Sequence, residues 1–347
     1  MSQDHATEQR VRDAVARATG RPTHGLPVTR LAGHASMRSY WRVGAAPASQ
    51  VVMVMPVGAA PEEVTAGGRP PVDPFVDVQR YLAGLGVRVP AILAFEEAEG
   101  LMVLEDLGDD MLETRLLAGD GRAGLYQRAV DQLARLRAGA EARPGGCVAF
   151  TRAFEAGLYR WELDHFREWL LEAWKGASLT AGERSELDGW FDRIAAGLAA
   201  EPRGFTHRDY QSRNLMVLAG GEQAVIDFQD ALLGPRQYDL VALLRDSYVE
   251  LPDDLVEAML HRYLERLEAE GGPRLPYRPF RETFDLLTVQ RKLKDAGRFV
   301  FIDRVRGNPG FLVSIPASLR YVREALARQP ELAPLRRLLA RHVPELG

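Results

Sequence analysis

Asp209, Asn214 and Asp227 are the residues of this 347-residue chain whose types and spacing could carry out catalysis. Asn214 follows Asp209 by five residues, and Asp227 comes directly after the short apolar segment 224–226. This spacing is typical of phosphoryl transfer, where one aspartate accepts the proton of the attacking hydroxyl while an asparagine and a second aspartate hold Mg2+ against nucleotide phosphates. We therefore predict that Asp209 is the catalytic base, that Asn214 and Asp227 bind Mg2+, and that ATP is the phosphoryl donor.

The chemistry of these side chains fits that prediction. Phosphoryl transfer needs an oriented nucleophile and neutralised charge more than it needs covalent help from the protein. Mg2+ prefers oxygen ligands, so an amide carbonyl beside a carboxylate is a suitable pair. A neutral Asn214 also leaves room for phosphate oxygens that a second carboxylate would repel. Asp209 needs no raised pKa, because its task is to orient a hydroxyl.

The sequence around these residues resembles that of a known family. The run His207-Arg208-Asp209 with Asn214, followed by Ile226-Asp227-Phe228, is similar to the catalytic core of the aminoglycoside/choline phosphotransferases, which are relatives of protein kinases. The extended run His-Arg-Asp-Tyr-x-x-Arg-Asn-Leu-Met and the later Tyr238-Asp239-Leu240-Val241 resemble the bacterial kinases that phosphorylate the anomeric hydroxyl of N-acetylmuramate and N-acetylglucosamine during cell-wall recycling. The resemblance is dense over residues 205–246 and thinner from about residue 28 to residue 325.

This resemblance implies an α+β, bilobal, protein-kinase-like fold. Residues 1–107 would form a β-rich nucleotide-binding lobe, and residues 108–347 a mostly helical catalytic and acceptor-binding lobe. In kinase-like loops the histidine that matches His207 supports the loop through hydrogen bonds, so Asp209 is preferred to His207 as the base. The family's counterpart of Asp239 likewise braces the catalytic loop.

Composition excludes several other classes of function. Hydrophobic residues make up 46% of the chain and charged residues 27%, as in ordinary globular proteins. The net charge is −4, from 44 basic and 48 acidic residues, which does not suggest a nucleic-acid binder. A single cysteine, Cys147, fits a reducing compartment, and no segment has the character of a signal peptide or a membrane span. We expect a cytoplasmic protein, preferably a monomer, whose partners are ATP and a small-molecule sugar acceptor, with no nucleic acid and no membrane.

A small-residue turn between two predicted strands is the expected phosphate-covering loop. The strands are 28–31 and 39–43, and a turn of this kind lets main-chain N–H groups approach phosphates. Such turns are usually plain hairpins, and the phosphate interpretation depends on the catalytic core that follows. Arg38 and Arg42 alternate with aromatic residues, and one of them could reach a phosphate. The residues predicted to bind the nucleotide here are Gly33, His34, Ala35, Ser36 and Arg38.

Two further features of the N-terminal region bear on the nucleotide. The apolar strand 51–55 lacks the lysine that protein kinases use to hold the α- and β-phosphates, as Met53 and Met55 show. The anomeric sugar kinases also tend to lack it, although its absence leaves a non-catalytic nucleotide-binding regulator as an alternative. After the strand 101–104, the position of Glu105 and Leu107 corresponds to the hinge of the family, where main-chain groups meet the adenine.

The acceptor is the least determined part of the prediction. Asp230 is either a second carboxylate near metal or substrate, or a local cap. Arg245 could line the acceptor site or form a surface pair, and Arg291 lies in a basic run that would suit a carboxylate on the acceptor. Choline, an aminoglycoside or another sugar are alternative acceptors. The candidate substrate contacts are therefore Asp230, Arg213, Arg245 and Arg291.

Overall fold

The structure, a computed structural model, describes residues 3–31, 38–55, 72–119 and 121–347. Two compact units make up the chain. The first comprises Met1–Asp110 together with Met216–Ile226, and the second comprises Met111–Leu215 together with Asp227–Gly347. The predicted division at residue 107 did not anticipate that the segment 216–226 groups with the N-terminal residues.

The first unit is built on an antiparallel sheet with the strand order β1-β2-β3-β5-β4. Helix α1 (Gln3–Thr19) packs on it through Val11 and Val15, which are buried against Trp41 and Val103. The second helix of this unit, α2 (Pro74–Gly84), begins at an Asp73 cap whose carboxylate accepts from the Phe75 N–H. The strands are β1 (Val28–Leu31), β2 (Ser39–Val43), β3 (Gln50–Val54), β4 (Ile92–Glu96) and β5 (Leu101–Glu105), with the short helix η2 (Glu97–Glu99) before β5.

A two-stranded hairpin from later in the sequence belongs mainly to this first unit. Its strands are β7 (Leu215–Val217) and β8 (Gln223–Val225), joined by η6 (Ala219–Gly221). The Val217 N–H donates to the Asp110 carbonyl at 2.7 Å, and the Val225 N–H donates to the Arg88 carbonyl at 2.8 Å. These two main-chain bonds explain why 216–226 groups with residues far away in sequence.

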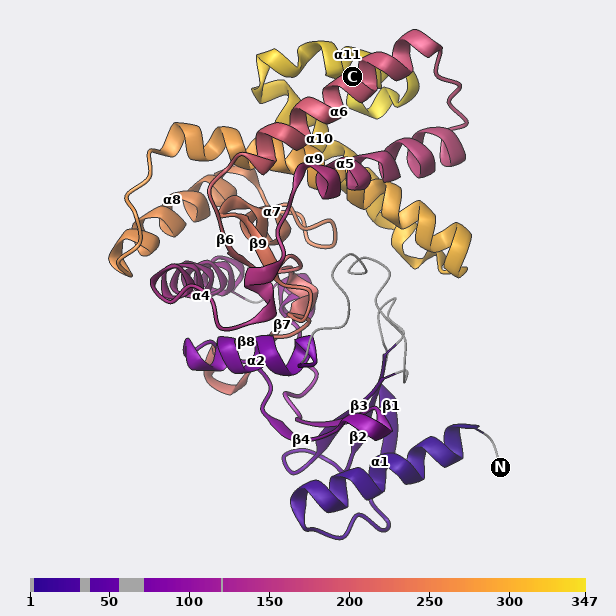
Figure 1. Cartoon of the computed structure of the whole chain (residues 1–347), viewed down its shortest axis with the longest axis vertical. Coiled ribbons are helices and arrows are strands. Elements are labelled where there is room, and N and C mark those ends of the chain that lie inside the picture. Colours follow the sequence, from indigo (N-terminus) through magenta and orange to yellow (C-terminus); the bar gives the residue numbers. More distant parts are fainter. Residues whose placement is uncertain (1–2, 32–37, 56–71, 120) are drawn as a thin grey trace. The chain divides into compact units, whose positions relative to one another are not determined.

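The second unit is mostly helical (Figure 1). Its small sheet pairs β6 (Arg203–Thr206) with β9 (Leu232–Pro235) in antiparallel register. Its α-helices are α3 (Leu112–Leu117), α4 (Arg122–Ala142), α5 (Ala156–His165), α6 (Ala181–Ala199), α7 (Gln237–Leu244), α8 (Asp253–Ala269), α9 (Tyr277–Arg306), α10 (Ile315–Arg328) and α11 (Ala333–His342). Other helical segments are the π-helix η4 (Phe166–Trp174) and the 3-10 turns η3 (Val148–Thr151), η5 (Ser212–Asn214), η7 (Pro309–Ser314), η8 (Pro330–Leu332) and η9 (Pro344–Leu346).

Helix α9 is the central element of this unit, because it packs against α5, α7, α10 and η4 (Figure 1). It carries a long series of buried side chains, which include Phe284, Leu287 and Leu293. Helix α9 continues to Arg306 and ends at the left-handed Gly307. None of the helices within the described ranges is long and apolar enough to span a membrane.

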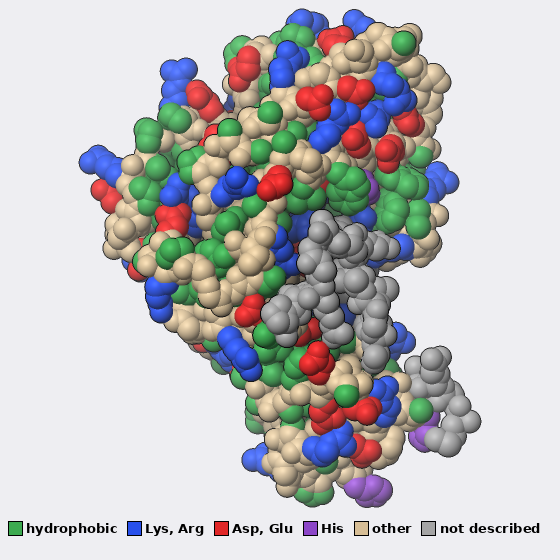
Figure 2. Space-filling model, viewed as in Figure 1, with side chains coloured by type: hydrophobic (Ala, Val, Ile, Leu, Met, Phe, Trp, Pro, Cys, Tyr) green, Lys and Arg blue, Asp and Glu red, His purple; other side chains and the backbone are tan. Residues whose placement is uncertain are grey.

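Charged side chains of both signs are interspersed on the face of the helical unit that Figure 2 shows. Several belong to ion pairs that connect neighbouring helices. Arg160 of α5 lies 2.6 Å from Asp188 of α6, and Arg167 of η4 lies 2.7 Å from the same carboxylate. These arginines are therefore neutralised within the protein.

Candidate active site

The loop that carries Asp209 leaves β6 and is held by the first turn of α7. The Asp239 carboxylate accepts the main-chain N–H of His207 at 2.7 Å and that of Arg208 at 2.9 Å. Asp239 lies at the N-terminal end of α7, where the helix dipole favours negative charge. This bracing role for Asp239 is the one that the family resemblance implied. His207 has a supporting position too, because its Nδ1 accepts the Asp209 N–H at 3.2 Å.

Asp209 points one carboxylate oxygen toward an arginine and is partly open to solvent. Its Oδ1 accepts from Arg291 Nη2 at 3.0 Å, while 37% of its side chain is exposed. Among the described residues, no group donates to its second carboxylate oxygen. Burial opposes ionisation of this carboxyl, but Arg291, Lys294 and Arg208 together hold the pKa of Asp209 below its ordinary value. A charged carboxylate with one available oxygen is suited to orient a hydroxyl group.

Asn214 lies between Asp209 and Asp227. Its Nδ2 donates to the Asp209 carbonyl at 2.9 Å and to Asp227 Oδ2 at 3.4 Å. These bonds fix the orientation of the amide, and within the described part of the chain no donor reaches the Asn214 carbonyl oxygen. Asp227 is exposed and holds a left-handed backbone with φ of 63°. The structure thus brings together an amide carbonyl and a carboxylate, both oxygen ligands of the kind that Mg2+ prefers.

The structure also brings Asp230 close to this pair, through a residue that sequence reasoning missed. The buried Gln229 donates from Nε2 to Asp227 Oδ1 at 2.9 Å and to Asp230 Oδ2 at 3.3 Å. One amide therefore links both carboxylates. Gln229 was visible in the sequence between Phe228 and Asp230, but nothing in its type indicated which way it would point.

The described residues contain no group of three or more His, Cys, Asp or Glu side chains arranged around a metal position. This does not conflict with a magnesium site at Asn214 and Asp227, because Mg2+ is usually bound by one or two protein ligands, with phosphates and water completing the coordination. The donor chemistry of the two residues therefore fits the ion.

The nucleotide-binding residues predicted in the first unit differ in whether the structure describes them and in what they contact. Gly33, His34, Ala35 and Ser36 lie outside the described residues, and Arg38 is half-buried just before β2. Arg42 is not available for phosphate, because it donates to both oxygens of Asp106 at 2.6 and 2.9 Å. Ser49 completes this cluster with a 2.6 Å bond to Asp106.

Glu105 and Leu107 also differ from each other. The Glu105 side chain pairs with Arg88, and its N–H donates to the Ala91 carbonyl at 2.9 Å. Leu107 is half-buried, and its main-chain groups bond to no other described residue. Leu107 is therefore the better placed of the two to bond a planar base through its main chain. Met53 of β3, the strand that lacks the expected lysine, is fully buried and pairs with Met102 of β5.

A profile of the phosphotransferase enzyme family matches residues 27–276, which is more than half of the chain. The chain belongs to this phosphotransferase family. The predicted family is therefore confirmed, and the protein is an enzyme of the phosphotransferase class.

Relatives of this phosphotransferase match most of its length. The N-acetylmuramate/N-acetylglucosamine kinase of Pseudomonas aeruginosa is 36% identical over 307 residues, covering 88% of this chain and 86% of the relative. The protein of the same name from Neisseria meningitidis serogroup B is 34% identical over 323 residues, covering 92% of this chain and 91% of its own.

Solved structures confirm the predicted kinase-like fold. A choline kinase from Streptococcus pneumoniae superposes with a TM-score of 0.62 at 14% identity, covering 93% of this chain and 99% of that one. An ADP-bound aminoglycoside phosphotransferase gives a TM-score of 0.56 at 12% identity, covering 91% and 98%. At these identities the likeness concerns the fold alone.

Two of the arginines predicted as acceptor contacts in the phosphotransferase are held by protein partners. Arg213 lies 2.9 Å from Glu113, and its guanidinium stacks 3.5 Å from the Tyr248 ring centroid. Arg245 is buried and donates to Asp253 at 3.0 Å. Neither guanidinium is bonded to Asp209 or Asp227, whereas Arg291 is bonded directly to Asp209.

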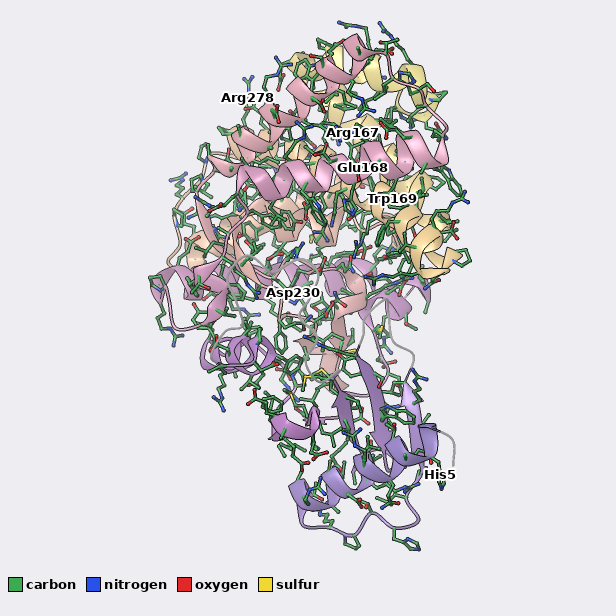
Figure 3. All side chains as sticks on the ribbon, turned by 45° about the vertical axis from the view of Figure 1, so that its right-hand side comes forward. His5, Arg167, Glu168, Trp169, Asp230 and Arg278 are labelled. Atoms are coloured by element: carbon green, nitrogen blue, oxygen red, sulfur yellow. The ribbon has the colours of Figure 1, made fainter. Side chains whose placement is uncertain are left out.

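The aromatic-rich segment at the end of α5 is separate from the turn that carries Asp227 and Asp230. Figure 3 shows Arg167, Glu168 and Trp169 together on η4 and Asp230 well apart from them. Trp169 packs edge-on to Phe301 of α9 at 5.0 Å between ring centroids. Trp169 therefore serves packing between η4 and α9.

Proposed function

We propose that this phosphotransferase transfers the γ-phosphoryl group of Mg-ATP to the anomeric hydroxyl of an N-acetylated amino sugar, N-acetylmuramate or N-acetylglucosamine, in cytoplasmic recycling of cell-wall sugars. The observation that carries the proposal is the group of relatives of that name, at 30–36% identity and over about nine-tenths of the chain. The arrangement of Asp209, Asn214 and Asp227 supports the chemistry.

In this proposal Asp209 orients the acceptor hydroxyl. The hydroxyl oxygen forms a bond to the γ-phosphorus, the bond to the departing ADP oxygen breaks, and the hydroxyl proton passes to the open Asp209 oxygen. Asn214 and Asp227 would hold Mg2+, which supplies charge neutralisation for the phosphate oxygens. Gln229 holds the Asp227 carboxylate in place with its 2.9 Å bond.

The basic run on α9 is proposed to face the acid group of N-acetylmuramate through Lys294. The side chains of Arg291 and Lys292 are 2% and 3% exposed, whereas that of Lys294 is 17% exposed. Lys294 is one helical turn beyond Arg291, and it contributes to the low pKa of Asp209. Lys294 pairs with Asp295 at 3.0 Å. As the most exposed of these three cations, it is the one that a carboxylate beside the reacting hydroxyl could meet.

ADP release from Mg-ATP tests the proposal across N-acetylmuramate, N-acetylglucosamine, glucose, choline and kanamycin. Each reaction is followed in parallel for loss of the sugar's reducing end. We expect ADP release with equal loss of reducing ends for the two N-acetylated sugars. ADP release without that loss would show that a hydroxyl other than the anomeric one is phosphorylated. ADP release with choline or kanamycin alone would show that the acceptor is not an N-acetylated sugar.

The Asp209→Asn variant tests the residue assignment. General acid–base groups contribute about 10²–10⁴-fold, so turnover should fall by at least about 100-fold while ATP binding persists. ATP binding by the wild-type protein without turnover on any acceptor would favour the alternative function, that of a non-catalytic nucleotide-binding regulator.

A further inference from the structure

Arg291 has a position in the structure that its sequence context did not indicate. Building on the proposed function, in which Asp209 accepts the hydroxyl proton, we propose that Arg291 is a positioning residue that fixes Asp209 and its loop. It does not bind the acceptor's carboxylate.

Two hydrogen bonds from one guanidinium carry this inference. Arg291 Nη1 donates to the Arg208 carbonyl at 2.7 Å, and Nη2 donates to Asp209 Oδ1 at 3.0 Å. The planar guanidinium holds its donors in a fixed fork, so the two bonds together set both the peptide before Asp209 and the carboxylate itself. The Tyr238 ring lies 4.9 Å from the same guanidinium and supports it.

The backbone conformation of Arg208 explains why the two hydrogen bonds from Arg291 are needed. It has φ of 79°, a left-handed conformation that is unfavourable for a residue with a bulky side chain. Backbone strain of this kind costs about 1–3 kcal/mol and persists only where the surroundings hold it. Asp239 holds the Arg208 N–H, Glu162 lies 3.5 Å from its guanidinium, and Arg291 holds its carbonyl. Of these three contacts, only Arg291 also reaches Asp209.

Burial separates Arg291 from the acceptor. Its side chain is 2% exposed, whereas that of Asp209 is 37% exposed. The guanidinium therefore lies behind the carboxylate. An acceptor's acid group would have to displace Asp209 to reach it.

The charges around the pair explain its electrostatic effect. Asp209 faces Arg291 and Lys294 from α9 and Arg208 from its own loop, and Tyr248 lies near it. Arg291 in turn faces Asp209, Asp295 and the Tyr238 hydroxyl. Arg291 therefore balances the charge of the Asp209 carboxylate and also fixes its direction through a direct hydrogen bond.

The test compares Arg291→Met and Arg291→Lys with the wild type on both N-acetylated sugars. For Arg291→Met we expect kcat to fall by about 100-fold or more, equally for both acceptors, with KM for ATP and for the sugars nearly unchanged. Arg291→Lys keeps the charge but only one of the two bonds, so its kcat should lie between those of Arg291→Met and the wild type.

Arg281→Met is the matched control, because Arg281 lies on the same helix, its side chain is 11% exposed, and it pairs with Asp285 and Glu257. It should lower the thermal midpoint while kcat stays near that of the wild type. A loss confined to N-acetylmuramate, or a rise in KM for the sugars with kcat unchanged, would overturn the positioning role. If Arg291→Met does not fold, Arg291→Lys decides: an equal fall in kcat for both sugars supports the role, and a loss confined to N-acetylmuramate overturns it. Failure of the wild type on both sugars would instead reject the proposed function.

Discussion

The Nδ2 atom of Asn214 donates to the Oδ2 atom of Asp227 at 3.4 Å, across an interval of twelve intervening residues. The same nitrogen donates to the Asp209 carbonyl at 2.9 Å, so the amide is oriented by the backbone of the proposed base. The proposed metal ligands and the proposed base are therefore coupled through one side chain. A change in any of the three should affect both magnesium dependence and turnover.

We predict that Asp227→Asn lowers kcat by about 10²–10³-fold, because a group that neutralises transition-state charge contributes that much. The Mg2+ concentration needed for half-maximal ADP release should rise as well. The matched control is Asp230→Asn, whose carboxylate is bonded to the same Gln229 amide. Equal effects of the two substitutions on the magnesium requirement would show that Asp230 shares the metal.

The brace at Asp239 leads to a prediction about stability. In Asp239→Asn an oxygen that accepts one of two buried N–H groups is replaced by an NH2 group. An unsatisfied buried donor costs about 1–3 kcal/mol, so the midpoint of denaturant unfolding should fall accordingly. Turnover should fall too, because the loop that carries Asp209 loses one of its two hydrogen bonds to Asp239. A stable variant with normal kcat would mean that the loop holds its conformation without Asp239.

The sequence was a good guide where the chemistry is local. Asp209, Asn214 and Asp227 lie within one short stretch, so their spacing alone predicted the group that the structure brings together. The strands predicted at 28–31, 39–43, 51–55 and 101–104 correspond to β1, β2, β3 and β5 for a similar reason, since their pattern of apolar residues is visible within each segment.

Contacts between distant segments could not be predicted in this way. Arg291 lies 82 residues from Asp209, and its place in a basic run gave no sign that it would be buried. Arg42 gave no sign that it would pair with Asp106, 64 residues later. The extension of α9 to Arg306 was predictable in principle, because Gly307 is a typical residue just beyond a helix end.

Lys294 leads to a prediction about specificity. Hydrogen bonds to charged groups contribute about 1.5–3 kcal/mol, so Lys294→Met should lower kcat/KM for N-acetylmuramate by about tenfold or more relative to N-acetylglucosamine. A smaller loss common to both sugars is expected, because Lys294 also acts on Asp209. Lys292→Met is the control, since Lys292 is buried and bonded to Asp295 and Ser247. An unchanged ratio between the two sugars in Lys294→Met would remove Lys294 from acceptor recognition.

Gly297 marks the place where α9 crosses the start of η4, and it leads to a prediction about packing. A Cβ at this position would lie 2.5 Å from the His165 carbonyl oxygen and 2.8 Å from the Phe166 Cα. Because these are backbone atoms, Gly297→Ala should force the two helices apart and destabilise the protein by about 1–3 kcal/mol. The helix that carries Arg291 would shift with it, so kcat should fall also.

Gly189→Ala on α6 is the matched control for this crossing. A Cβ at Gly189 meets no atom within 4 Å, so the substitution should stabilise the helix by about 0.5–1 kcal/mol and leave kcat unchanged. Thermal unfolding and ADP release measured on both variants make the comparison. If Gly297→Ala matched Gly189→Ala in both measurements, close approach of α9 to η4 would not be required for the position of Arg291.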